Sequence, residues 1–296
     1  MRTQLLHLRT DESIPGRVTV WIDVAERPVN VLFDEVFDEL VVVLDAMRSN
    51  ESPPTLIFRS AKRKGFIVGA DIKRILAIET DSEIQSFLLK GQAALERLEA
   101  YPGNTVAVIQ GPCLGGGLEF AMACRYRIAS DTESTQLGMP EAKLGLMPGW
   151  GGTQRIVEII GYVNGLAMLL DGEAVDAQRS LEMHLVDALF HEQSIEEELS
   201  QFLDNVGLLR TNRLRPAEID ESTRLAFDRQ FKNSLLNAQF PHSQSAIYNA
   251  VSIGARESRD IGFRLERVSF FPLLMLPEVR ETLQRFGTRP KTQAES

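Results

Sequence analysis

A glycine-rich segment at residues 111–124 has the composition of an anion-binding turn. It reads GPCLGGGLEFAMAC and joins an apolar run, which predicts a buried strand, to small and apolar residues that predict a helix. Gly115 to Gly117 let a ligand approach the backbone and leave amide N–H groups free at the positive end of that helix. The segment therefore favours an anion or oxyanion site, although a tight strand-to-helix turn explains the glycines equally well.

Glu119 lies on the first turn of this expected helix, among small and apolar neighbours. Burying a carboxylate in such surroundings is costly, and desolvation raises its pKa, partly opposed by the helix N-terminus. A carboxyl group with a raised pKa suits proton transfer. A surface or capping role for Glu119 is the alternative interpretation.

A second carboxylate, Glu141, lies in a turn-rich segment that reads LGMPEAKLGLMPGWGGTQR, residues 137–155. Pro140 precedes it and Pro148 and Gly149 follow it, so the loop should hold Glu141 in a fixed position. Two positioned carboxylates suit general acid/base chemistry. Taken alone, this segment also fits a loop with a purely structural glutamate.

Basic residues precede a third segment of interest at residues 59–72, which reads RSAKRKGFIVGADI. Positive side chains followed by a glycine turn suit phosphate binding and offer a backbone N–H at Ala70. A solvated charged surface is the alternative interpretation, and for the individual lysines the better one. The four basic side chains are Arg59, Lys62, Arg63 and Lys64.

The elements that must position these residues alternate between strand and helix, which indicates an α/β protein. From residue 151 the pattern turns helical, with Gly161 and Gly172 placed as helix C-caps. The expected strands are 18–23, 55–58 and 105–109, and the expected helices are 33–47 and 82–99.

Beyond residue 190 the chain is charged and almost free of strand patterns, so we place a domain boundary there. Residues 1–190 form the expected core and 191–296 a helical C-terminal region, with a linker at 210–220. Two helices should follow the linker, at 221–236 and 243–271. The second carries an apolar stripe that we expect to be buried: Ile247, Val251, Ile261, Leu265 and Val268.

The overall composition is that of an ordinary globular chain, and 296 residues are ample for a sizeable core. The net charge of -9 argues against binding to nucleic acid or an anionic membrane surface. No apolar run approaches the about 18 residues that span a bilayer, and the start lacks a secretory signal, so we expect a cytoplasmic protein. Two cysteines and four histidines in no ligand-like spacing make a disulfide or metal site unexpected.

Three motifs together resemble the enoyl-CoA hydratase/isomerase (crotonase) superfamily, across roughly residues 15–190. They are FIVGADI, GPCLGGGLEFAMAC and MPEAKLGLMPGWGGTQR, in that order. The first motif and the Pro-Gly-Trp-Gly-Gly run resemble most the hydratase half of bacterial multifunctional fatty-acid oxidation enzymes. Residues 242–271 are similar to the linker helix that follows this half. The chain carries no dinucleotide fingerprint for the dehydrogenase half, so we expect a free-standing hydratase part.

The resemblance implies a spiral of ββα units followed by a helical C-terminal region, and it implies a site. Two backbone N–H groups, at Ala70 and Gly116, form the oxyanion hole that holds the thioester carbonyl. Glu119 and Glu141 are the implied catalytic pair, which adds water to a 2-enoyl-CoA to give 3-hydroxyacyl-CoA in fatty-acid β-oxidation. Further substrate contacts are expected from Lys62, Gly69, Asp71, Ile72, Gly115, Pro140 and Gly149.

No metal or separate cofactor is implied, because coenzyme A enters as part of the acyl-CoA substrate. The family forms trimers or hexamers, so a homo-oligomer or an association with other β-oxidation enzymes is expected. Two alternative functions stay open: isomerisation of 3-enoyl-CoA to 2-enoyl-CoA, and a non-catalytic acyl-CoA-binding subunit. Turnover of the conjugated thioester distinguishes hydration from binding alone.

Overall fold

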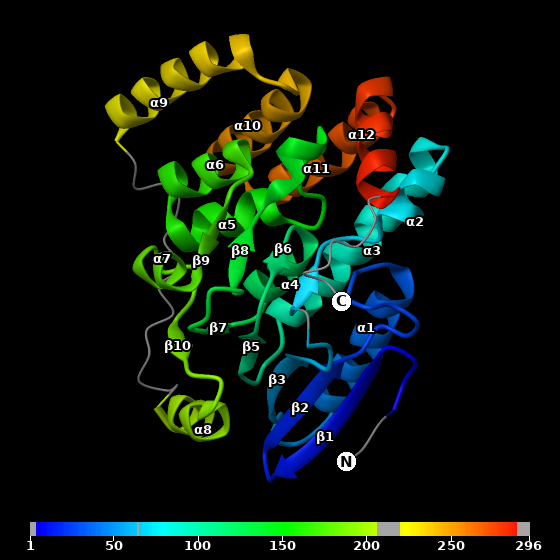
Figure 1. Ribbon diagram of the computed structural model, residues 1–296, viewed down its shortest axis with the longest axis vertical. Helices are drawn as coiled ribbons and strands as arrows, with labels where there is room; N and C mark the ends of the chain where they lie inside the picture. The colour runs from blue at the N-terminus through cyan, green and yellow to red at the C-terminus, as the bar shows by residue number, and fades with distance from the viewer. Residues whose placement is uncertain (1–3, 64, 206–219, 289–296) are drawn as a thin grey trace.

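The computed structural model describes residues 4–63, 65–205 and 220–288, and its strands form two sheets (Figure 1). The larger sheet has the spatial order β1-β2-β3-β5-β7-β10: β1 (Leu8–Ile14), β2 (Arg17–Ile22), β3 (Thr55–Ser60), β5 (Thr105–Ile109), β7 (Tyr126–Ser130) and β10 (Ala188–Phe190). The smaller sheet has the order β4-β6-β8-β9: β4 (Ile67–Val68), β6 (Cys113–Leu114), β8 (Gln136–Gly138) and β9 (Ala174–Asp176).

Helices cover these sheets and make up almost all of the described chain after β10. The helices of the first half are α1 (Asp34–Arg48), α2 (Ile72–Ala77), α3 (Asp81–Glu99), α4 (Gly116–Ala123) and the 3₁₀ helix η1 (Pro140–Leu144). The middle holds α5 (Gly152–Ile160), α6 (Tyr162–Asp171), α7 (Ala177–Glu182) and α8 (Ile195–Asn205). The C-terminal part holds α9 (Glu221–Ser234), η4 (Leu235–Asn237), α10 (Pro241–Arg256), α11 (Arg259–Leu274) and α12 (Pro277–Thr288).

The chain moves between the two sheets in a repeated pattern. Strands β3, β5 and β7 are parallel neighbours in the larger sheet, and β4, β6 and β8, which follow them in sequence, are parallel neighbours in the smaller one. Helices follow each pair, so the arrangement is a spiral of ββα turns. The expected α/β fold class is confirmed.

Local sequence signals explain where several elements begin and end. All five residues of β5 are buried, as expected for a Val- and Ile-rich parallel strand covered on both faces. Helix α3 starts with a capping box formed by Thr80 and Glu83. The predicted C-caps are confirmed, because Gly161 ends α5 and Gly172 ends α6, both with positive φ.

The C-terminal helices pack directly onto the helices of the ββα core and do not form a separate unit (Figure 1). Helix α10 contacts α5 and α6, α11 contacts α3 and α5, and α12 contacts α2. Ile247, Val251 and Leu274 are each 0% exposed and belong to the same apolar cluster as the strands. The boundary at residue 190 stays a prediction, and residues 210–219 of the expected linker lie outside the described residues.

The prediction of one long helix over 243–271 is wrong, and so is part of its buried stripe. Ser258 has an extended backbone and its side chain accepts a hydrogen bond from the Ile261 N–H, so it starts a new helix. The break resets the helical phase. Ile261 and Val268 are therefore 37% and 46% exposed, and α11 instead buries a different set: Gly262, Phe263, Glu266, Phe270, Leu273 and Leu274.

This phase shift is tested by comparing two substitutions in the C-terminal helices. Ile247→Ala removes a fully buried side chain and should lower the free energy of unfolding by about 2–5 kcal/mol. Val268→Ala, at an exposed position, should change it by at most about 0.5 kcal/mol. Urea unfolding of both variants and the parent measures the difference. Equal losses for the two variants would show that Val268 is buried after all.

Candidate active site

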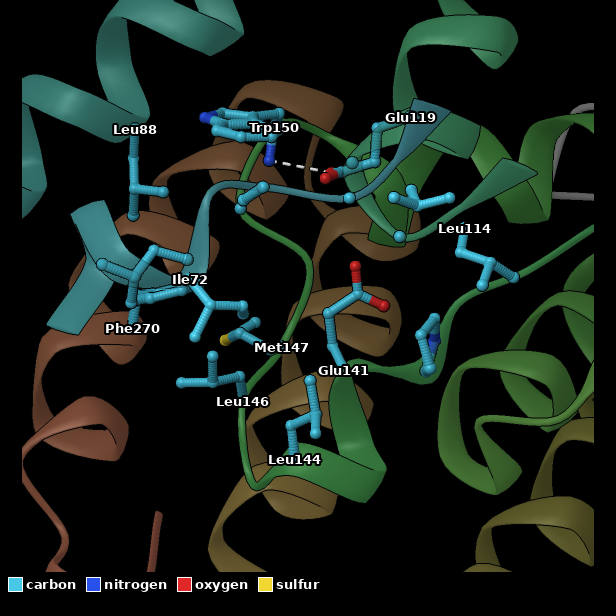
Figure 2. A pocket seen from close by; sticks show the side chains of 18 of the residues that line it. Ile72, Leu88, Leu114, Glu119, Glu141, Leu144, Leu146, Met147, Trp150 and Phe270 are labelled. Carbon is cyan, nitrogen blue, oxygen red and sulfur yellow. Dashed lines mark hydrogen bonds between the residues drawn. The ribbon is translucent and has the colours of Figure 1, made fainter. Parts of the chain in front are cut away.

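A largely apolar pocket lies where the ββα turns meet the C-terminal helices (Figure 2). Its walls come from residues 68–75, 87–88, 114–119 and 140–150 and from two side chains of the C-terminal helices, Phe270 and Phe286. Among the described residues that line it, only Glu119 and Glu141 carry ionisable side chains. A pocket that is apolar except for a few convergent polar groups is the usual form of a small-molecule site.

The three consecutive glycines each make room for a different neighbour at this pocket. A β-carbon at Gly115 would lie 2.6 Å from the Glu141 Oε1 atom, and one at Gly116 would lie 2.4 Å from the Trp150 ring. At Gly117 it would meet the Ile67 carbonyl oxygen at 2.0 Å. Larger residues cannot occupy these positions, so the glycines bring helix α4 into contact with the opposite walls of the pocket.

Glu119 is 1% exposed and is held by the segment that begins helix α5. Its Oε1 atom accepts a hydrogen bond from the backbone N–H group of Trp150, at 2.8 Å (Figure 2). The same atom accepts another from the N–H group of Gly152, at 2.7 Å. Burial raises the pKa of Glu119 well above its usual range, and the nearby charges of Glu266 and Glu141 raise it further. The two backbone hydrogen bonds oppose this rise only in part.

Glu141 is positioned by the 3₁₀ helix η1, which starts with Pro140 and ends at the left-handed Gly145. Its Oε2 atom is buried and has no hydrogen-bond partner among the described residues, so it is available to a bound molecule. Burial raises the pKa of Glu141 to about 7, and the charge of Glu266 adds to the rise. In Figure 2 the carboxyl groups of Glu119 and Glu141 both project from the wall of this pocket.

The Ala70 and Gly116 backbones lie side by side, because the Ala70 nitrogen is 3.6 Å from where a Gly116 β-carbon would be. Leu32 fixes the first of them: its N–H donates to the Gly69 carbonyl, and its own carbonyl accepts from the Asp71 N–H. This pairing turns the Ala70 N–H away from Leu32. Gly116 is the first residue of α4. Within the described residues neither N–H donates a hydrogen bond, so both are free to bind an oxyanion.

Most of the residues predicted to contact substrate line this pocket, and two do not. Lys62 forms an ion pair with Asp23 at 2.5 Å, and Asp71 caps helix α2 and pairs with Arg27. Asp71 thus positions the turn that carries Ala70. The predicted residues that do line the pocket are Gly69, Ala70, Ile72, Gly115, Gly116, Glu119, Pro140, Glu141 and Gly149.

The prediction that Arg59 joins a phosphate-binding cluster is wrong. Its guanidinium is 2.7 Å from the Glu196 carboxylate and stacks over the Trp21 ring, and the side chain is almost fully buried. Strand alternation sends it to the side of the sheet covered by α8. Arg63 is exposed, and Lys64 lies outside the described residues.

Several residues of the pocket wall were not predicted from the sequence. Trp150 packs its ring against Phe37 and Phe87, and Phe270 and Phe286 come from α11 and α12. Glu266 was not predicted either; it is a 0% exposed carboxylate of α11 that interacts with both pocket glutamates. The apolar residues give no local signal of their function. Burial of a Glu in an amphipathic helix can be predicted only when it is known which face of the helix points into the protein.

The described residues contain no cluster of His, Cys, Asp and Glu side chains suited to hold a metal ion. Cys113 and Cys124 are both buried, and neither forms a disulfide within the described residues. Of the helices in the described ranges, none is long and apolar enough to cross a bilayer. The polar groups that the described pocket does present are the carboxyl groups of Glu119 and Glu141 and the backbone amides of Ala70 and Gly116.

Comparison with solved structures shows the fold. An enoyl-CoA hydratase from Bacillus halodurans superposes with a TM-score of 0.70 at 20% sequence identity, covering 94% of this chain and 99% of that one. For an enoyl-CoA hydratase from Bacillus anthracis the TM-score is 0.62 at 23% identity, with 95% of each chain covered. These similarities confirm the expected crotonase-like architecture.

Sequence comparison shows the family. The alpha subunit of the fatty acid oxidation complex of Idiomarina loihiensis is 33% identical over 292 residues, which are 95% of this chain and 41% of that protein. The corresponding subunit of Aliivibrio fischeri is 42% identical over 168 residues, 56% of this chain and 24% of that protein. The chain thus spans less than half the length of these relatives. A sequence profile for enoyl-CoA hydratase/isomerase matches residues 19–240, and the chain belongs to this family.

Proposed function

We propose that the chain adds water to the double bond of a 2-enoyl-CoA thioester and releases 3-hydroxyacyl-CoA. The observation that carries the proposal is the placement of two buried carboxyl groups, on Glu119 and Glu141, beside two free backbone N–H groups. Membership of the hydratase/isomerase family supports it. Fatty-acid β-oxidation is the proposed setting, because relatives are named as fatty acid oxidation subunits.

The Ala70 and Gly116 amides would receive the thioester oxygen. Hydration of a conjugated thioester moves electron density from the double bond onto this oxygen, which becomes an enolate in the transition state. Two neighbouring N–H donors that the backbone already holds in place would stabilise that charge with little reorganisation, and one donor of this kind is worth about 3 kcal/mol. Polarisation also makes the β-carbon electrophilic enough to be attacked by water.

The glutamate pair would carry out the two proton transfers of the reaction, while the second proton of the water stays in the new hydroxyl group. One carboxylate accepts a proton from the water as its oxygen bonds to the β-carbon, and the other group, protonated, gives a proton to the α-carbon as the enolate collapses. The net change is the gain of one water molecule. This division of labour needs one ionised and one protonated carboxyl, and coupled carboxyls with raised pKa values supply that state near neutral pH.

The acyl chain and the coenzyme A part of the substrate would contact the pocket wall and its rim. Ile72, Leu144, Met147 and Phe270 form an apolar surface suited to the acyl chain. Coenzyme A would enter as part of the substrate, with no separate cofactor, and Lys62 and Arg63 remain the proposed contacts for its phosphates. We also propose a cytoplasmic location, and either a trimer or hexamer of this chain or its association with other β-oxidation enzymes.

Isomerisation of 3-enoyl-CoA to 2-enoyl-CoA is a second candidate, because the same carboxyl pair faces the same pocket and the family includes isomerases. It would move one proton between the γ- and α-carbons and leave the mass unchanged. Supplying each substrate alone to the purified protein separates the two activities. If the protein binds both enoyl-CoA substrates but converts neither of them, it would instead be an acyl-CoA-binding subunit.

Substitution of the two glutamates tests the proposed roles. Glu119→Gln and Glu141→Gln should each lower the kcat for hydration by about 100- to 10,000-fold, because each removes a general acid or base. The affinity for the thioester should stay nearly constant, since neither group holds the thioester itself. Absorbance of the conjugated thioester measures turnover, and calorimetric titration measures binding. Near-normal turnover in either variant would remove that residue from the mechanism.

The pH dependence of stability tests whether the site retains a proton. Burial raises the pKa of Glu141 from 4.5 to about 7. The resulting stabilisation is fully present below about pH 4.5 and is lost as the pH rises through about 7. In Glu141→Gln, the fall in unfolding free energy between about pH 5 and pH 7 should therefore be shallower by up to about 1.4 kcal/mol per pH unit.

Denaturant titrations at several pH values measure this slope. Glu133→Gln, a change at an exposed site outside the pocket lining, is the matched control and should leave the slope as it is in the parent protein. If Glu141→Gln and the parent lose stability with pH at the same rate, Glu141 does not hold a proton in the folded state near neutral pH.

A further inference from the structure

Two buried carboxylates share the N-terminal end of helix α5. Glu119 accepts hydrogen bonds from the backbone N–H groups of Trp150 and Gly152. Glu266, from the distant helix α11, accepts from the two N–H groups that alternate with them, Gly151 at 2.7 Å and Thr153 at 3.0 Å. Four successive amides are thus divided between the two carboxylates.

We propose that Glu266 is a positioning residue, which fixes the first turn of α5 so that the amides binding Glu119 stay in place. The inference rests on the hydration proposed above, since it is Glu119 whose alignment matters. Glu266 does not line the pocket, so it acts through the backbone and touches no substrate.

The other contacts of Glu266 show how firmly this turn is held. Its Oε1 atom also accepts from the Thr153 hydroxyl at 2.5 Å, and its Oε2 atom accepts from the Gln92 amide at 3.1 Å. Gln92 in turn donates to the Gly149 carbonyl at 3.0 Å. The backbone on both sides of Trp150 is therefore tied to α3 and α11, and Trp150 itself packs against Gly116 of the proposed oxyanion hole.

The burial of a carboxylate in this position indicates a specific role for Glu266, because an apolar side chain of similar size would ordinarily pack there at a lower cost in free energy. Burial raises the pKa of Glu266 to about 7, and the charge of Arg155 of α5 opposes this rise. The charge of Glu266 in turn raises the pKa values of the two pocket glutamates. From α3 the contact is the neutral Gln92. Glu266 therefore affects both the geometry and the protonation of the catalytic pair.

Glu266→Gln tests the proposal, because it keeps the shape but turns an NH₂ group towards backbone donors. We expect kcat for hydration to fall by about 10- to 100-fold, as expected for a displaced catalytic group, with KM changed by less than about threefold. Loss of the Glu266 charge lowers the pKa of Glu119 and Glu141, so the pH–rate profile should move to lower pH.

Ser252→Ala is the matched control. It removes another polar contact between the C-terminal helices and the core, the 2.9 Å hydrogen bond from α10 to Tyr162, away from the α5 N-terminus. This variant should keep the kcat and pH profile of the parent. If Glu266→Gln keeps a parental kcat and pH profile, or if Ser252→Ala loses as much kcat, the positioning role is wrong.

Thr153→Val provides a second test if Glu266→Gln does not fold. It removes the hydroxyl that donates to Glu266 and accepts from the Gln154 amide, and it keeps the Glu266 carboxyl group. It should lower kcat in the same direction by a smaller factor. A folded Thr153→Val with parental kcat would contradict the proposal.

A readout without turnover separates this proposal from the proposed function. Carbon-13 NMR of labelled glutamate carboxyls, assigned with Glu119→Gln, reports the titration of Glu119 directly. We expect that titration to shift to lower pH in Glu266→Gln, because the charge of Glu266 is lost. Thr153→Val keeps the carboxyl group and removes one hydrogen bond that holds it to α5, so an unshifted titration in that variant would count against positioning. A parent protein that hydrates no 2-enoyl-CoA, yet shows the shifts, would overturn hydration and leave the coupling of Glu266 to Glu119 standing.

Discussion

The site depends on one shared element, the amide-rich beginning of helix α5. A helix start leaves its first N–H groups without partners in the helix. Here successive N–H groups from Trp150 to Thr153 are satisfied by Glu119 and Glu266, two carboxylates that repel each other and are both buried. The helix end holds the two carboxyl groups close together. Burial raises the pKa of both, and the charge of Glu266 raises that of Glu119 further. Buried carboxyl groups with raised pKa values are suited to the acid/base chemistry proposed for this pocket.

The beginning of helix α5 also links the C-terminal helices to the pocket, through its hydrogen bonds to Glu266 of α11. The family profile ends at residue 240, but Glu266, Phe270 and Phe286 lie beyond it and complete the surroundings of the pocket. The relative from Idiomarina loihiensis matches 95% of this chain, so the similarity continues through these helices. Docking of α10 to α12 is thus part of forming the site, and not only a means of covering apolar surface.

Much of the site was predictable from the sequence because its signals are local. Glu119 in an apolar helix, Glu141 between prolines, and the glycines of the strand-to-helix turn are each recognisable within a few residues. Glu266 was not, because its function depends on a helix start more than a hundred residues earlier in the chain. The phase of α11 was predicted wrongly because Ser258 restarts the helix, and Arg59 was misassigned because its partner Glu196 lies far away in sequence.

The most direct test of the account is the fate of a 2-enoyl-CoA incubated with the purified full chain in water labelled with both heavy oxygen and deuterium. The account predicts a 3-hydroxyacyl-CoA that carries one heavy oxygen at the β-carbon and one deuteron at the α-carbon, as mass spectrometry and NMR would show. A product without heavy oxygen at the β-carbon, or an unchanged thioester, would contradict it.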